Sequence, residues 1–571
     1  MVSVFSHSRR VPYPTPSRRS FVVLSALAGA ALPVLAGCDL PVVSKGKGGS
    51  ASSSRSSTTA GGSASSGSSA KAGSTDWQKL DAHIMGHKVS VEVSPVIRQD
   101  EKTSIIALRL TRAKDDASID AVVANSYNGN DNKLSISNYL GVPSIFRPGT
   151  GASLVKLLDL GSGRVWSAIN GSGLFLDLAP GEKISSFLSF GKVDSDTVTV
   201  MVPMAGFVTV SVLEADAAKK ADVNLSIAQT SLDQSSHAAP ELAAPVTIDR
   251  YTRALDDSTS TQAGGKNITV TLASDVTFAP DSADLASGAE AQIQTVANQL
   301  KQHPDGGTLT IVGHTDDVQD DAYNQTLSDK RANAVKTRLE QLTSLDKWKT
   351  SVSGKGESQP KVKGTTDQAR AANRRVEITL TPTGGTARKG ASATPNNAGG
   401  ATLPDPQGPV AKGSEGVTLT SKGTDTSGEV IITLDHVTRT GEYLLGTITC
   451  TVKDGSTGAP LHALLEDPQT LLANQRGEDG GALPTFNASD GLTLIAGGER
   501  IFAADYRDAD TEQHLPLTEL NVSDHLKAGI ASVCVVWPDP GGDTVILDHP
   551  EGKYSPKGTA FRLTDVPVKN S

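Results

Sequence analysis

The period of the hydrophobic residues changes along this chain, and that change constrains the fold more than any other feature. Apolar and polar residues alternate within 76–235 and again within 416–567, as in strands with one buried face. Within 261–382, short β-branched runs alternate with apolar residues at helical spacing, a pattern typical of an α/β layer structure. We therefore predict a multidomain chain with a central α/β sandwich and an all-β immunoglobulin-like sandwich on each side.

The two alternating segments share two short sequence matches in the same order. Residues 158–166 resemble 494–502, and residues 196–198 resemble 543–545. The matches predict two copies of one sandwich type, and chance similarity between β-rich sequences is the alternative. A stretch rich in Pro, Gly and Asn at 383–415 is predicted to be a linker.

The N-terminus has the pattern of an export signal. Arg18 and Arg19 precede an apolar stretch, and Leu35-Ala36-Gly37-Cys38 resembles a lipobox. The apolar stretch is shorter than the ~20 residues that a spanning helix needs. We predict a twin-arginine lipoprotein signal peptide at 1–37, a lipidated Cys38 and a Ser/Gly-rich tether over 38–75. The alternatives are an ordinary signal peptide that contains a cysteine, and an uncleaved transmembrane helix.

The two remaining cysteines, Cys450 and Cys534, lie in strand-like apolar runs. Because an exported protein can keep disulfides, we expect a bond between them. Two buried free thiols that behave as small apolar residues are the alternative.

An acidic and a basic residue stand 15 positions apart in the middle segment. Asp316 follows a predicted strand, and Arg331 lies on the next predicted helix. An ionised Asp accepts from an ammonium group, and Arg binds a carboxylate through two parallel N–H bonds. Leu327 and Ser328 stand at the predicted start of that helix, where free N–H groups favour a carboxylate. The spacing therefore indicates a site for a free amino-acid group.

These motifs resemble the OmpA-like peptidoglycan-binding domain, together with Gly354-Lys355-Gly356-Glu357 and Asn373-Arg374-Arg375-Val376-Glu377. Peptidoglycan-associated lipoproteins and flagellar stator proteins also carry this domain. The resemblance covers 261–382 and implies the OmpA-like fold, with diaminopimelate of the peptidoglycan stem peptide as ligand. The binding residues that the resemblance implies are Asp316, Arg331, Asn324, Leu327, Ser328, Asn373 and Arg374.

The loop after Asp316 departs from the family pattern. Family members usually carry Gly three residues after the acid, where this chain has Gln319, and Asp317, Asp320 and Asp321 make the loop unusually acidic. The departure predicts a turn that is longer or differently shaped, with an effect on ligand preference.

Other sequence features argue against other classes of protein. A net charge of −9 and an aromatic content of 4% disfavour nucleic acid as a partner. His83 and His87 stand four apart, but Gly86 and the strand pattern argue against a metal pair. The chain shows no nucleophile elbow, zinc-protease motif or phosphate loop. We expect no enzyme activity, no cofactor and no metal; a glycan hydrolase would need a carboxylate pair in one cleft.

The predicted function is therefore that of a bacterial envelope lipoprotein outside the cytoplasm. It would be lipid-anchored to a membrane and would bind peptidoglycan non-covalently through diaminopimelate stem peptides, tethering envelope to cell wall. The alternative is an envelope assembly or surface-recognition factor whose β-sandwiches bind a protein or glycan partner.

Overall fold

The computed structural model describes most of the chain after the expected tether. The described residues are 71–117, 132–141, 152–168, 170–171, 176–233, 244–386, 403–422, 427–453, 459–465, 488–508, 514–520, 525–526, 528–551 and 558–571. The predicted signal peptide, Cys38 and nearly all of the tether lie outside this part. Within it, no helix combines the length and the apolar character that crossing a membrane requires.

The first β region, residues 71–233, folds as the alternation predicts. Strands β1, β2, β4 and β10 form an antiparallel sheet in that order. Their bounds are Gln78–Ile84, His87–Val93, Thr103–Arg112 and Lys183–Gly191. A second run of strands follows from β4 in the order β3, β12, β11, β6 and β7. These span Val96–Arg98, Gly206–Glu214, Thr197–Val202, Lys156–Asp159 and Arg164–Ser167. The region also contains a short helix, α1 (Ser137–Leu140), and ends with helix α2 (Leu225–Asp233).

The last β region, residues 403–571, is also built from strands. One sheet has the order β20, β21, β23 and β30. Their bounds are Val417–Lys422, Ser427–Thr433, Tyr443–Val452 and Gly529–Pro538. A second run has the order β19, β32, β31, β25 and β26. These span Val410–Lys412, Phe561–Asn570, Thr544–His549, Thr493–Ala496 and Glu499–Ile501. Strand β19 lies within the predicted linker, so the linker ends earlier than expected.

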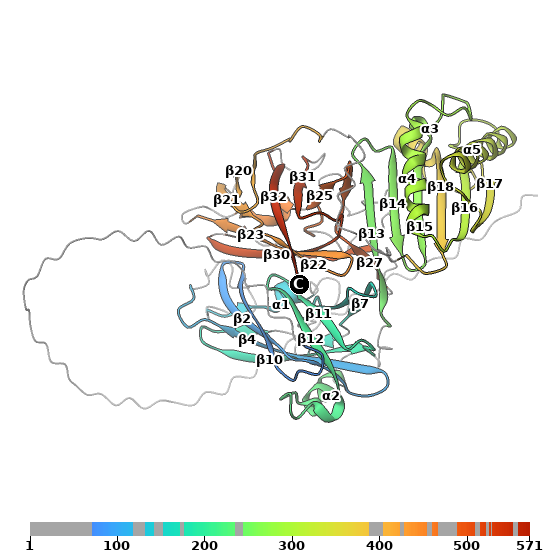
Figure 1. Cartoon of the computed structure of the whole chain (residues 1–571). Coiled ribbons are helices and arrows are strands. Elements are labelled where there is room, and N and C mark those ends of the chain that lie inside the picture. The colour runs from blue at the N-terminus through green and yellow to red at the C-terminus, as the bar shows by residue number, and fades with distance from the viewer. Residues whose placement is uncertain are drawn as a thin grey trace, which may run out of the picture. The chain divides into compact units, whose positions relative to one another are not determined.

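The middle domain, residues 259–382, is the predicted α/β structure. Its sheet has the order β14, β15, β18, β16 and β17, with one parallel pair, β16–β17 (Figure 1). These strands span Thr259–Gly264, Asn267–Ala273, Arg375–Pro382, Gly307–His314 and Trp348–Gly354. The parallel pair requires a crossover, and helix α5 (Asp321–Leu342) provides it.

Helices and sheet of the middle domain bury one common apolar face. Alternate strand residues such as Val270, Ile311 and Ile378 are fully buried against α4 (Ala289–Gln302) and α5. The intervening residues stay half-exposed, and Thr269 contacts Thr379 through its hydroxyl at 3.2 Å. The helical spacing read from the sequence therefore corresponds to the core of this domain.

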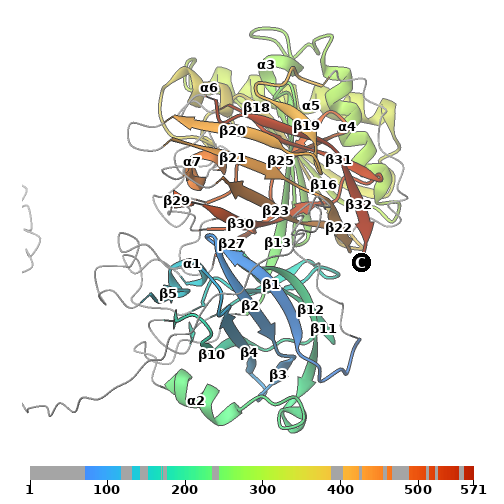
Figure 2. The same cartoon turned by 90° about the vertical axis from the view of Figure 1, so that its left-hand side faces the viewer.

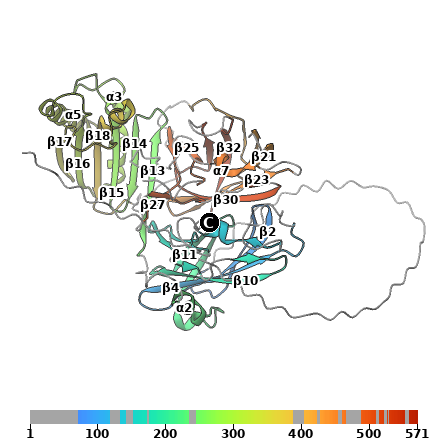
Figure 3. The ribbon, with the colours of Figure 1, turned by 180° about the vertical axis from the view of Figure 1, so that it is seen from behind.

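Strand β13 (Val246–Ala254) connects all three regions through backbone pairing (Figure 3). It pairs with β7 of the first β region, with β26 and β27 (Asp505–Arg507) of the last, and with β14 of the middle domain. The two matched sequence segments take corresponding places in the pairing. The order β11, β6, β7, β13 in one region parallels β31, β25, β26, β13 in the other.

The two β regions share one hydrophobic core cluster rather than standing apart on either side of the middle domain. The cluster includes Leu80 and Val210 of the first region together with Leu444 and Trp537 of the last. Strands β1 and β30 approach each other, and Gly86 N donates to Ile530 O at 2.9 Å (Figure 2). The structure is mostly β and multidomain, and the immunoglobulin-like type of the flanking regions stays a prediction.

The expected disulfide is not formed. Cys450 and Cys534 are both free and buried. They lie on paired strands, but the register places Cys450 opposite Ala531 and Cys534 opposite Thr447. An offset of three residues along a strand points the two side chains to opposite faces of the sheet, where no bond can join them.

Candidate functional site

Helix α5 of the middle domain begins earlier than its sequence suggested. The expected start at Leu327 and Ser328 is wrong, because Asp320 caps the helix and accepts from Tyr323 N at 2.9 Å. An Asp at this position satisfies a backbone donor that the first turn leaves open. The N–H groups of Leu327 and Ser328 therefore lie inside the helix, where they are not free for a ligand.

Asp316, directly after β16, is held by the arginine of the closing motif. Its Oδ2 accepts from Arg374 Nη1 at 2.6 Å, while Nε and Nη2 of Arg374 hold both oxygens of Asp275 at 2.7 and 2.6 Å. The hydrogen bonds that Arg374 donates to Asp275, and then the one that it donates to Asp316, raise the pKa of Arg374 above its ordinary value. Asp275, Arg374 and Asp316 thus form a fixed row of alternating charge.

Arg331 is the most buried charged group of this site. Its side chain lies over the ring of Phe278, with the guanidinium carbon 5.1 Å from the ring centroid, and the residue is 5% exposed. Nε donates to Ser282 O at 2.9 Å. Among the described residues its two Nη groups have no hydrogen-bond acceptor and no carboxylate partner. Burial lowers the pKa of Arg331, and Asp275 and Asp281 oppose that effect.

Asn324 and Ser328 hold the loops around the site. Asn324 Nδ2 lies 3.2 Å from Asp316 O, 3.0 Å from Gln319 O and 2.7 Å from Glu357 Oε2. Ser328 Oγ accepts from Gly356 N at 2.9 Å. Both residues are buried. They position the backbone that carries Asp316, and Leu327 lies half-buried on the same helix.

The motif glycines allow α5 to pack closely on the strand ends. A Cβ at Gly313 would lie 2.2 Å from Ser328 O, and one at Gly354 would lie 2.4 Å from Asp329 N. Such distances are far below contact, so a side chain at either position would push the helix away. The two glycines therefore fix the distance between Asp316, at the strand end, and Arg331, on the helix.

Asn373 closes a loop rather than facing the site. Its amide exchanges two hydrogen bonds with the backbone of Val362, each of 2.9 Å. The acidic loop is likewise committed to structure, since Asp317 accepts from Arg370 Nε at 2.8 Å and Asp320 is the helix cap. Gln319, at the family's usual Gly position, contributes its carbonyl to Asn324.

His314 is buried at the end of β16, as a structural histidine would be. Its Nε2 lies 3.8 Å from Glu377 Oε2. Burial, together with the nearby Arg375, lowers the pKa of His314 to about 4. The imidazole is therefore neutral at physiological pH and adds no charge to the site.

Sequence reasoning missed three residues that the structure places here: Asp275, Phe278 and Tyr323. Asp275 stands two residues after the end of a strand, as Asp316 does. This shared position could have identified Asp275 from the sequence. Tyr323 contributes electrostatically at Arg331 and is 40% exposed. Val276, next to Asp275, and Val318, two residues after Asp316, are also exposed. The site thus combines a buried cation, a held carboxylate and apolar edges. It can bind a small zwitterion by accepting from an ammonium and donating to a carboxylate.

Comparison with known proteins locates matches in the middle of the chain. Residues 277–374 match the OmpA family. Outer membrane porin F of Pseudomonas aeruginosa is 42% identical over 103 residues, which are 18% of this chain and 29% of that protein. The probable lipoprotein YiaD of Escherichia coli is 34% identical over 119 residues, 21% of this chain and 53% of that protein.

A solved structure of the peptidoglycan-associated lipoprotein from Burkholderia pseudomallei is 32% identical, and the match covers 18% of this chain and 86% of that one, with a TM-score of 0.17. The match to the two sequence relatives spans about a third and about half of their lengths.

Proposed function

Since residues 277–374 form an OmpA-family domain, as the motifs indicated, we propose that this chain binds peptidoglycan non-covalently. The domain would hold the diaminopimelate of an uncross-linked stem peptide and so tether the envelope to the cell wall. The proposed activity is binding, without a catalytic step. Binding by this domain would also hold the two β regions close to the cell wall.

The state of Arg331 is the observation that carries this proposal. Its guanidinium is almost fully removed from water and makes one hydrogen bond among the residues that the structure describes, so two Nη groups remain for an acceptor. A carboxylate fits that geometry through two parallel bonds. The fixed partner of opposite sign, Asp316, is held by Arg374 at the end of the adjacent strand. Its presence supports a ligand that brings an ammonium together with the carboxylate.

Diaminopimelate meets both requirements because its side chain ends in an amine and a carboxylate on one carbon. A lysine stem offers the ammonium but no carboxylate for Arg331. A cross-link that consumes the amine removes the partner of Asp316. The proposed site therefore distinguishes among cell-wall stems by the group that Arg331 contacts.

Titration of the full-length protein with two soluble muropeptides tests this function. One muropeptide carries a free diaminopimelate stem, and the other is identical except for lysine. We expect the first to bind at least tenfold more tightly, which is ~1.4 kcal/mol. Equal affinities, or no binding of either, would contradict the proposed role of Arg331.

The proposed anchor is the lipid on Cys38, which lies outside the described residues. YiaD, one of the relatives, is itself named a probable lipoprotein. Replacing Cys38 by Ser would remove the acyl chains, whose burial contributes ~0.8 kcal/mol per CH₂. The variant should leave the membrane fraction on washing while its muropeptide affinity is unchanged. A variant that stays in the membrane fraction would show a different anchor.

A further inference from the structure

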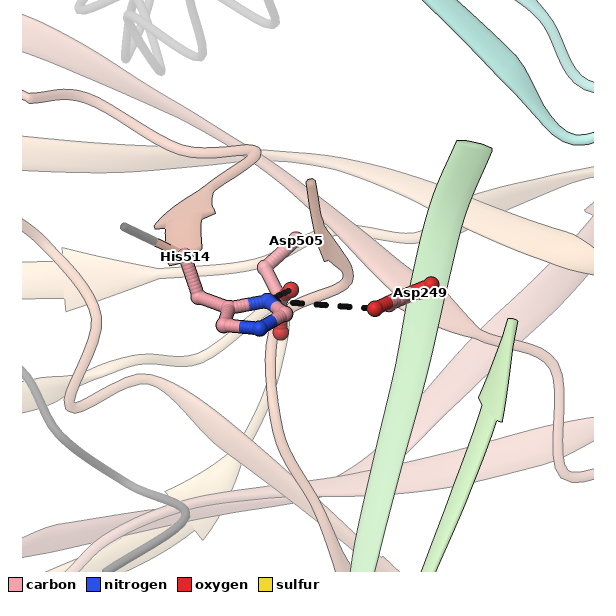
Figure 4. Close-up of side chains that lie close together, drawn as sticks. All are labelled: Asp249, Asp505 and His514. Atoms are coloured by element: carbon pink, nitrogen blue, oxygen red, sulfur yellow. Dashed lines mark hydrogen bonds and ion pairs between the residues drawn. The ribbon is translucent and has the colours of Figure 1, made fainter. Parts of the chain in front are cut away.

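Three side chains with metal-binding atoms converge on β13, away from the OmpA-family domain's own site. They are Asp249 of β13, Asp505 of β27 and His514 of β28 (His514–Pro516). Figure 4 shows the imidazole of His514 next to the carboxylate of Asp505, with the carboxylate of Asp249 farther away on the same side of the ring. His514 Nδ1 lies 2.8 Å from Asp505 Oδ1 and 3.8 Å from Asp249 Oδ2, and all three ligand atoms lie within 4.8 Å of one another.

Strand register brings these residues to one face of the sheet. Asp249 stands directly opposite Asp505 in the antiparallel β13–β27 pair. Arg507, two residues after Asp505 and therefore on the same face, pairs with His514 across β27 and β28. The three side chains therefore share a face although they are far apart in sequence.

Gly264 of β14 makes room for the carboxylate of Asp249. A Cβ at this position would lie 1.6 Å from Asp249 Oδ1 and 2.5 Å from its Cγ. Because Gly264 has no side chain, Oδ1 of Asp249 fits against its backbone. The other oxygen, Oδ2, points toward His514 (Figure 4).

The charges of this cluster favour a bound cation. Like charges directly opposite each other in an antiparallel pair are destabilising, and both carboxylates are mostly buried, with exposed side-chain fractions of 16% and 10%. A dication between the carboxylates would offset their repulsion.

The donor set selects the class of cation. One imidazole nitrogen with two carboxylate oxygens suits zinc and neighbouring transition metals better than calcium, which takes oxygen ligands. Metal–ligand bonds of roughly 2.0–2.2 Å place neighbouring ligand atoms about 3 to 3.5 Å apart. The distances from His514 Nδ1 to the two carboxylate oxygens, 2.8 and 3.8 Å, lie on either side of that range. Small rotations of these side chains would therefore bring all three ligand atoms to bonding distance from one ion.

We propose that Asp249, Asp505 and His514 form a binding site for a divalent transition-metal ion, with zinc as the best match. The site lies at the middle of the strand that pairs with all three regions. A bound ion fastens β27 and β28 of the last β region to β13, which continues through β14 into the OmpA-family domain. Metal binding thus stabilises the attachment of that domain to the rest of the protein.

Isothermal titration of the metal-free full-length protein with Zn²⁺, and separately with Mn²⁺, tests the site. We expect one saturable Zn²⁺ ion that His514→Ala, Asp249→Asn and Asp505→Asn each weaken at least tenfold. The Tm should rise with Zn²⁺ in the wild type, because a ligand that binds only the folded state stabilises it. Asp81→Asn is the matched control, since its side chain is 67% exposed and far from β13 in sequence; it should retain both effects.

His514→Gln provides a second variant in case an alanine or asparagine substitution prevents folding. It removes the imidazole nitrogen but keeps a polar side chain, and retained muropeptide affinity reports that the protein is folded. Cobalt, whose visible absorption reports its ligands, should show bands in the wild type that are lost in His514→Gln. No saturable binding by the wild type, or binding that survives in all cluster variants, overturns the proposal. In either case His514 would contact the two carboxylates directly, without a metal ion between them.

Discussion

The OmpA-family domain and the joined β regions bury charged groups in different ways. Arg331 in the domain is nearly inaccessible but makes one hydrogen bond within the described part of the chain, so its guanidinium keeps donors for a ligand. Glu519 in the last β region is fully buried, and its Oε1 accepts from Met204 N at 2.8 Å and from Cys534 N at 2.9 Å. Arg331 thus keeps hydrogen-bond donors for a ligand. Glu519 instead uses its acceptor oxygen to join the first and last β regions.

This difference predicts a separation of effects. Changes at the domain's site should alter peptidoglycan binding and leave the stability of the joined regions intact. Changes at the contact between the β regions should alter the stability of these regions and leave peptidoglycan binding intact.

The largest expected effect is on binding. Arg331→Met keeps most of the side-chain volume over Phe278 but removes the guanidinium. It leaves the ligand carboxylate without a partner, at a cost of ~2–5 kcal/mol, so affinity for the diaminopimelate muropeptide should fall at least about 30-fold. Arg338→Met on the same helix removes an arginine that pairs with Glu290, and it should bind like the wild type. Calorimetric titration of both variants with the muropeptide tests this prediction. Equal losses of affinity in the two variants would contradict a specific role of Arg331 in binding.

The next effect is a pH dependence of stability at the contact between the β regions. Burial raises the pKa of Glu519 from 4.5 to about 7. The folded state therefore binds this proton more tightly than the unfolded state between those values, and the free energy of unfolding falls as pH rises through the window. The loss should be on the order of 3 kcal/mol by pH 8.

Glu519→Gln keeps an acceptor for Met204 N and Cys534 N while removing the ionisation. Urea unfolding at pH 5 and pH 8 should show a smaller loss of stability in this variant than in the wild type. Glu429→Gln, a half-exposed residue paired with Lys453, is the control and should follow the wild type. An unchanged pH dependence in Glu519→Gln would show that Glu519 ionises normally.

The smallest expected effect concerns the two free cysteines. Burial raises the pKa of Cys450 to about 12 and raises that of Cys534 well above its ordinary value. Neither thiol should react with a thiol reagent in the folded protein, because the thiolate is the reactive form. A reductant should leave the Tm unchanged, since Cys450 and Cys534 are both free thiols. Rapid labelling at either cysteine before unfolding would contradict the burial of both.

The sequence by itself determined the features that depend on neighbouring residues. Alternation predicted the strands of both β regions, and helical spacing predicted α4 and α5, because burial of one face follows directly from the period of the element. The string from Gly313 through Glu377 identified the OmpA-like domain, which the family match confirms. Asp316, Arg331 and Arg374 do lie at one site, although the start of α5 was predicted six residues too late, because the capping role of Asp320 was not recognised.

Only the tertiary structure decided how distant segments meet. The pairing of β13 with strands from three regions, the shared core of the two β regions and the row Asp275–Arg374–Asp316 all depend on contacts across long stretches of chain. The same holds for Asp249, Asp505 and His514, whose spacing in sequence has no recognisable motif. It also holds for Cys450 and Cys534, whose strand register sets them on opposite faces. A local pattern gives each strand its buried face, but the register between strands is fixed only when the whole core packs.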